Sequence, residues 1–119
     1  MKRFALAKLK KWKENKNKKP LIIRGARQVG KTWLMKEFGK TCFEKTAYVN
    51  FDSNPRMQQL FEGEIDVERM ILAISAETGV SINCTDTLLI FDEVQEVTKA
   101  LGSLKYFCEN APEYAIVAA

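Results

Sequence analysis

Residues 20–32 read PLIIRGARQVGKT, and this stretch gives the strongest indication of the fold class. The apolar run 21–24 follows a proline and ends at a glycine, which predicts a short buried strand. Residues 25–32 match the pattern G-x-x-x-x-G-K-[ST]. Residues 31–38 then predict a helix, with Gly39 as its C-terminal stop. A strand, a glycine-rich loop and a helix in this order are the context in which such a loop binds phosphate.

The loop has a physical reason to bind anions. Glycine permits backbone angles that let the N–H groups of the loop point inward and form an anion-binding nest. The helix that follows adds roughly half a positive charge at its N-terminus. We expect Lys31 to meet the β- and γ-phosphates of a nucleotide, and the Thr32 hydroxyl to ligate Mg²⁺. The predicted phosphate-binding residues are Gly25, Ala26, Arg27, Gln28, Val29, Gly30, Lys31 and Thr32. The plainer alternative is a glycine turn that happens to precede a helix.

Residues 88–93, LLIFDE, form the second signal. Four apolar residues predict a buried strand that delivers two carboxylates to its C-terminal end, where α/β sheets bind ligands. There Asp92 is available to hold Mg²⁺ through its water shell. Glu93 is the natural general base for a water aligned on the γ-phosphate, which favours hydrolysis over phosphoryl transfer to a bound acceptor. A solvated turn with two acidic residues is the alternative.

The rest of the chain alternates between strand and helix patterns. Beyond the first strand and helix, the predicted elements are 46–51 (strand), 66–78 (helix), 87–91 (strand), 98–110 (helix) and 114–118 (strand). Asp66 can cap the first of these helices, and Gly79 follows its end. Elements that alternate at this spacing predict an α/β fold with a parallel sheet covered by helices on both faces.

Composition narrows the function classes. The 119 residues are 46% hydrophobic, enough for one globular core, and no apolar run approaches the ~20 residues of a membrane span. The absence of histidine excludes histidine-based triads, histidine general bases and most zinc sites. Three cysteines without a C-x-x-C spacing favour a reducing, cytoplasmic location over a disulfide framework.

Positive charge is concentrated in residues 1–19, which hold nine Lys/Arg and one acidic residue, whereas residues 20–119 hold ten and fourteen. An apolar stripe formed by Met1, Ala5, Leu9 and Trp12 predicts a basic amphipathic helix and a linker over 1–19, followed by the α/β domain over 20–119. One interpretation is a solvated basic face on a helix whose Trp12 side packs on the domain. The others are a contact with nucleic acid or an acidic protein and, less favoured by the short stripe, a membrane surface.

Several single residues carry open alternatives. Arg24 and Arg27 either touch phosphates or pair with acidic side chains. Asn50 and Asp52 end a predicted strand, where they either orient water or metal or, as strand ends favour, form a turn. Trp33, the three cysteines and the apolar helix stripes are predicted to be core.

Both motifs resemble those of a known family. Residues 24–32, RGARQVGKT, and residues 92–95, DEVQ, are similar to the R-G-x-R-Q-V-G-K-T loop and the D-E-x-Q motif of a family of bacterial and archaeal AAA-type ATPases. The resemblance implies a P-loop core with a parallel sheet of order 5-1-4-3-2, ATP and Mg²⁺ as ligands, and ATP hydrolysis. It implies that Lys31 and Thr32 meet phosphate and metal, that Asp92 is the metal aspartate and that Glu93 is the catalytic glutamate. Glu93 and Lys31 together form the expected catalytic residues. Gln95 follows Glu93 by two positions and can bridge the two motifs.

The resemblance also bears on the surroundings of this core. Family members place a sensor residue, a fifth strand, an arginine finger and a lid after the fourth strand, so the chain resembles the N-terminal half of such a catalytic domain. We therefore expect an ATP-binding module that couples Mg-ATP binding and hydrolysis to conformational change in a larger protein, with homo-oligomers as an option. Two alternatives stay open: a non-catalytic nucleotide-binding or interaction module, and a P-loop phosphotransferase. In members the segment before the first strand lies near the adenine, which adds a nucleotide contact to the interpretations of residues 1–19.

Overall fold

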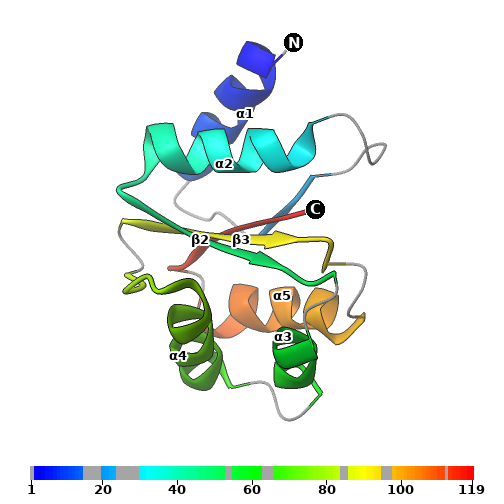
Figure 1. Ribbon diagram of the computed structural model, residues 1–119. Helices are drawn as coiled ribbons and strands as arrows, with labels where there is room; N and C mark the ends of the chain where they lie inside the picture. Colours follow the sequence, from blue (N-terminus) through cyan, green and yellow to red (C-terminus); the bar gives the residue numbers. More distant parts are fainter. Residues whose placement is uncertain are drawn as a thin grey trace.

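The computed structural model describes residues 2–14, 20–23, 30–52, 55–62, 66–83, 86–94, 98–111 and 113–119. Helices and strands alternate along the chain (Figure 1). Their bounds are α1 (Lys2–Glu14), β1 (Leu21–Ile22), α2 (Lys31–Cys42), β2 (Lys45–Asn50), α3 (Pro55–Leu60), α4 (Val67–Thr78), β3 (Thr87–Asp92), α5 (Thr98–Asn110) and β4 (Ala115–Ala118). Of these, α5 has the predicted bounds, and most of the others differ from prediction by a few residues at their ends.

The four strands form one sheet in the order β1-β4-β3-β2, and every neighbouring pair is parallel. This confirms the predicted α/β fold with a parallel sheet. Parallel neighbours need crossover connections, and each connection here carries one or two of the helices α2 to α5. The fifth strand of the predicted order 5-1-4-3-2 stays a prediction.

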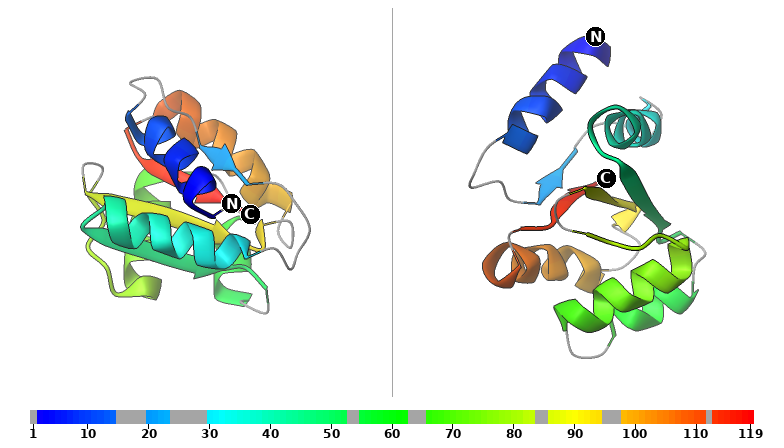
Figure 2. Two further views of the ribbon diagram at one scale, coloured as in Figure 1. Left: turned by 90° about the horizontal axis from the view of Figure 1, so that it is seen from above. Right: turned by 90° about the vertical axis from the view of Figure 1, so that its left-hand side faces the viewer.

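Helices cover the sheet on both faces, α1 and α2 on one and α3, α4 and α5 on the other (Figures 1 and 2). Alternation along β3 explains the two layers. Leu88 and Ile90 pack into the core beneath α1 and α2, whereas Leu89 and Phe91 pack into the larger core on the other face. All six residues of β3 are buried, as expected for a central strand of a parallel sheet.

Helix α1 packs Leu9 and Trp12 on the α2 side of the domain. Leu9 is buried, and the Trp12 ring meets the Phe38 ring edge-on at a centroid distance of 6.1 Å. Lys13 Nζ donates to the Cys42 carbonyl and lies 4.4 Å from the centroid of the Phe43 ring. These contacts support the interpretation in which the Trp12 side packs on the domain. Binding of nucleic acid or an acidic protein by the outward face stays a prediction.

Gly39 does not end α2, so that prediction is wrong. The helix continues to Cys42, and Gly39 lies buried inside it. A Cβ at this position would collide with Thr46 Oγ1 and lie 3.0 Å from Thr46 Cγ2. The glycine therefore permits the close approach of α2 to β2 instead of stopping the helix.

Two other expectations about the core need correction. Trp33 is 44% exposed, because it lies on the face of α2 opposite to the buried Met35. Cys42 and Cys108 are half-buried and not fully in the core, and Cys84 lies outside the described residues. The stripe of α4 behaves as predicted: Met70 and Ile74 are buried.

Helix α3 is missing from the sequence prediction. It has six residues, too few to show a helical hydrophobic period, and it begins at Pro55. Met57 is buried, and Gln58 Nε2 donates to the Phe51 carbonyl at 2.9 Å. Tertiary contacts therefore hold a helix that local patterning does not predict.

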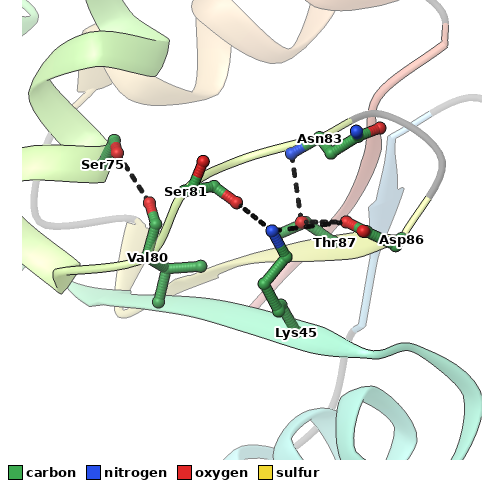
Figure 3. A network of polar contacts seen from close by, with 7 residues as sticks. All are labelled: Lys45, Ser75, Val80, Ser81, Asn83, Asp86 and Thr87. Carbon is green, nitrogen blue, oxygen red and sulfur yellow. Dashed lines mark hydrogen bonds and ion pairs between the residues drawn. The ribbon is translucent and has the colours of Figure 1, made fainter.

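A polar network joins the amino ends of β2 and β3 (Figure 3). Lys45 Nζ donates to the Ser81 carbonyl at 2.5 Å and lies 3.8 Å from Asp86 Oδ1. Thr87 Oγ1 donates to Asp86 Oδ1 at 2.7 Å and accepts from the Asn83 amide at 3.1 Å. Because parallel strands start at one edge of the sheet, this network ties down the edge opposite to Asp92.

Candidate functional site

The candidate site begins at the N-terminus of α2. Gly30 is the N-cap residue with φ 77° and ψ 27°, a left-handed conformation that a residue with a side chain rarely adopts. Lys31 and Thr32 are the first two helical residues, where backbone N–H groups and the helix dipole favour an anion. The other predicted loop residues, Gly25, Ala26, Arg27, Gln28 and Val29, lie outside the described residues, as do Arg24 and Gln95.

The structure brings the two sequence motifs together. Thr32 Oγ1 donates a hydrogen bond of 2.6 Å to Asp92 Oδ2, although the two residues are 60 positions apart in the chain. Asp92 is the last residue of β3 and is only 4% exposed. A buried carboxylate needs hydrogen-bond donors, and the helix that begins at Lys31 supplies one of them. The hydroxyl and the carboxylate therefore meet at the carboxyl edge of the sheet.

Tyr48 on β2 also contacts Asp92, and we refer to Thr32, Tyr48 and Asp92 as the cluster. Its hydroxyl donates to the same Asp92 Oδ2, also at 2.6 Å. Burial is the main cause that raises the pKa of Tyr48 well above its ordinary value, and the hydrogen bond to Asp92 and its charge raise it further. A hydrogen bond with the Asn50 side chain lowers the pKa of Tyr48 and so offsets part of this rise. The Tyr48 hydroxyl consequently stays protonated, and a donor, at neutral pH.

Glu93 occupies an uncommon backbone conformation. Its φ of 56° lies in the left-handed region, and among the described residues other than glycine it alone has a positive φ. Its amide donates to Asp92 Oδ1 at 3.0 Å, and the next residue, Val94, donates from its amide to the Ala119 carbonyl at 3.0 Å. The turn after β3 is thus held on both sides, and backbone strain of this kind is concentrated at functional sites.

Asn50 and Asp52 follow the turn interpretation. Asn50 Oδ1 accepts from the Asp52 amide at 2.8 Å, which is the hydrogen bond of a local Asx turn. Asn50 also pairs in register with Asp92 across β2 and β3. This turn therefore borders the Thr32–Asp92 pair, and its hydrogen bond gives the Asn50 side chain a local role.

The donor set fits a hard divalent cation beside phosphate. A hydroxyl and a carboxylate are the oxygen ligands that Mg²⁺ prefers. In the part of the chain that the structure describes, no group of three or more His, Cys, Asp or Glu side chains is arranged to hold a metal alone. Mg²⁺ is usually bound by one or two protein ligands together with waters and substrate phosphates, so Thr32 and Asp92 suit Mg²⁺ that arrives with a nucleotide.

Two cavities lie elsewhere on the molecule. One, of about 500 Å³, is between α3 and α4 and is lined in part by Arg56, Leu60 and Glu77. The other, of about 340 Å³, is between α4 and α5 and is lined in part by Asp66 and Tyr106. Neither cavity is lined by Thr32 or Asp92. The candidate site is therefore defined by the hydrogen bonds of Asp92.

Sequence reasoning did not identify Tyr48. The available signal was the alternation of the segment TAYVNF, which places residues 48 and 50 on the same face of the strand. The hydroxyl of Tyr48 reaches Asp92 from a residue that pairs with Ile90, and no motif in the sequence marks this contact.

A family model described as an AAA domain matches residues 17–119. No match was found among curated proteins or among solved structures. The matched segment includes α2 and β3, which carry Thr32 and Asp92. Separately, none of the helices in the described ranges is both long and apolar enough to cross a membrane.

Proposed function

The chain belongs to this family of AAA domains, nucleotide-binding modules of the ATPase type, and from that membership we propose that it binds ATP with Mg²⁺ where α2 meets β3. The single observation that carries the proposal is the 2.6 Å hydrogen bond from Thr32 Oγ1 to Asp92 Oδ2. It joins a phosphate-loop pattern to a strand-end carboxylate that lies 60 positions away in the chain.

Each residue of the proposed site has a distinct task. The backbone of residues 25–30 and the N-terminus of α2 bind the phosphates, and the Lys31 ammonium neutralises their charge. Thr32 and Asp92 would hold Mg²⁺ through the oxygen atoms of their side chains. When bound, the ion neutralises charge that develops on the phosphates during phosphoryl transfer.

Hydrolysis requires a group that aligns and deprotonates water, and we assign this task to Glu93. It follows Asp92 directly, and its amide is tied to Asp92 Oδ1. This tie fixes the Glu93 backbone relative to the proposed metal position, which is what a general base needs. Coupling of hydrolysis to conformational change in a larger protein is part of the same proposal.

Equilibrium binding of ATP by isothermal titration calorimetry, with and without Mg²⁺, tests the proposal. We expect Lys31→Ala to abolish ATP binding, because the loop then lacks its counter-charge. Lys40→Ala is the matched control, since it removes the same charge from the exposed last turn of the same helix. Equal ATP affinity in Lys31→Ala and Lys40→Ala would exclude the proposed site.

A further inference from the structure

We propose that Tyr48 is a positioning residue for the metal site: its hydroxyl holds the Asp92 carboxylate in the orientation that also accepts from Thr32, and so sets the Mg²⁺ concentration that ATP binding requires. This inference rests on the proposed function, because it assigns a role within the same site. Tyr48 belongs to neither sequence motif and lies 44 positions before Asp92 in the chain.

Three donors fix the Asp92 carboxylate. The Thr32 and Tyr48 hydroxyls both lie 2.6 Å from Oδ2, and the Glu93 amide lies 3.0 Å from Oδ1. Rotation of the carboxylate about its last torsion angle would break contacts on both oxygens at once. Because hydrogen bonds to an ionised acceptor are the stronger class, this arrangement holds one orientation.

Tyr48 is itself held in place from two sides. In the sheet it pairs with Ile90, two residues before Asp92, so strand alternation directs its ring along the α2 face toward the carboxylate. Lys36 Nζ lies 4.2 Å from the centroid of the ring, within the range of a cation–π contact. Lys36 follows Thr32 by one helical turn, so α2 holds both the carboxylate and the tyrosine that orients it.

The consequence is specific to the metal. Outer-shell partners that orient a metal-binding carboxylate typically change metal affinity by 10–100-fold when removed. Phosphate binding by the loop and Lys31 does not use Asp92 orientation. Loss of the Tyr48 hydroxyl should therefore weaken Mg²⁺ binding at the ATP site, so that more free Mg²⁺ is needed, and leave ATP binding without metal unchanged.

The test is a titration of free Mg²⁺ at fixed ATP, read by calorimetry or by a fluorescent ATP analogue. Tyr48→Phe keeps the ring and its contact with Lys36 but removes the donor. We expect it to raise the free Mg²⁺ at half-saturation about tenfold, with unchanged ATP affinity in EDTA. Tyr106→Phe on α5 is the matched control and should leave both quantities unchanged. In an Asp92→Asn background, Tyr48→Phe should cause no further shift.

The outcomes distinguish a failure of ATP binding from a failure of the role of Tyr48. If the wild-type chain binds no ATP at any Mg²⁺ concentration, the proposed function fails and the role of Tyr48 fails with it. If the wild-type chain binds ATP in a Mg²⁺-dependent way and folded Tyr48→Phe gives the same Mg²⁺ curve, the inference alone is overturned. If Tyr48 had only a structural role, Tyr48→Phe would lower the free energy of unfolding and leave the Mg²⁺ titration curve unchanged.

A second measurement needs no variant at position 48. The chain has three tyrosines, so signals of chains labelled at the tyrosine ζ carbon can be assigned by elimination with Tyr106→Phe and Tyr114→Phe. We expect the Tyr48 signal to shift on addition of Mg-ATP and to shift less with ATP in EDTA, while the other two signals stay in place. A Tyr48 signal that ignores Mg²⁺ would overturn the positioning role.

Discussion

Glu93 combines a proposed chemical role with a measurable backbone strain. A left-handed φ of 56° costs a residue with a Cβ about 1 kcal/mol, whereas glycine adopts it freely. We expect Glu93→Gly to raise the free energy of unfolding by about 1 kcal/mol, and Glu93→Gln to change it by less than about 0.5 kcal/mol. Urea denaturation measures both values.

The same two variants test the general-base assignment. Both remove the carboxylate, so both should retain ATP binding and lose single-turnover hydrolysis relative to the wild-type chain. A Glu93→Gly chain that is more stable yet less active would match the common trade between stability and function. Hydrolysis at the wild-type rate in either variant would remove Glu93 from the mechanism.

The raised pKa of Tyr48 predicts a pH dependence of stability. A tyrosine whose pKa is raised by folding favours the folded state below its unfolded pKa of about 10, and this contribution falls as pH rises above that value. We expect the unfolding free energy of the wild-type chain to fall more steeply between pH 9 and 11 than that of Tyr48→Phe. Parallel curves for the two chains would show that Tyr48 titrates normally.

At the scale of elements, the contact between α2 and β2 depends on Gly39. An alanine there would gain helix propensity, but its Cβ would collide with Thr46 Oγ1 and approach Leu88 Cδ2 to 3.3 Å. We expect Gly39→Ala to destabilise the fold by about 1–3 kcal/mol, as overpacking of a tight contact does. Thermal or urea denaturation measures the loss.

Gly102 provides the matched control for this prediction. It lies in α5, is exposed, and a Cβ there would meet no atom within 4 Å. Gly102→Ala should therefore stabilise the chain by about 0.5–1 kcal/mol through helix propensity alone. If both glycine variants change stability in the same direction, the close approach of α2 to β2 does not explain Gly39.

The elements also show how far sequence patterning reaches. The predicted helix 66–78 is observed as α4, with Asp66 accepting a hydrogen bond from the Glu68 amide and Gly79 at its C-cap, because all of these signals are local. The prediction that Gly39 ends the helix was wrong because the role of Gly39 is a close approach to Thr46 on β2. Helix α3 escaped prediction because six residues carry too little periodicity.

At the scale of the whole molecule, topology explains why part of the site could be predicted. Parallel strands with crossover helices place the N-terminus of α2 and the carboxyl end of β3 at one edge of the sheet. The approach of Thr32 to Asp92 therefore follows from the positions of the two motifs in this topology. The contribution of Tyr48 depends on register between β2 and β3 and on one rotamer, and neither can be read from composition or motif.

Ligand binding should also stabilise the whole fold. The site joins α2, β2 and β3, so a nucleotide that binds only the folded chain must raise the unfolding free energy. At ATP concentrations one hundredfold above the dissociation constant the gain is about 2.7 kcal/mol. We expect differential scanning fluorimetry to show a higher melting temperature with Mg-ATP for the wild-type chain and no change for Lys31→Ala.

The most direct test of the central claim locates the metal-bound nucleotide on the chain. Manganese(II) replaces Mg²⁺ and broadens NMR signals of nearby amides, and a 13.6 kDa chain is well suited to this measurement. With Mn-ATP, we predict selective loss of the amide signals of residues 30–33 and 92–93 while those of α4 persist, and no loss with Mg-ATP. Signals lost at another surface, or lost nowhere at saturating Mn-ATP, would contradict it.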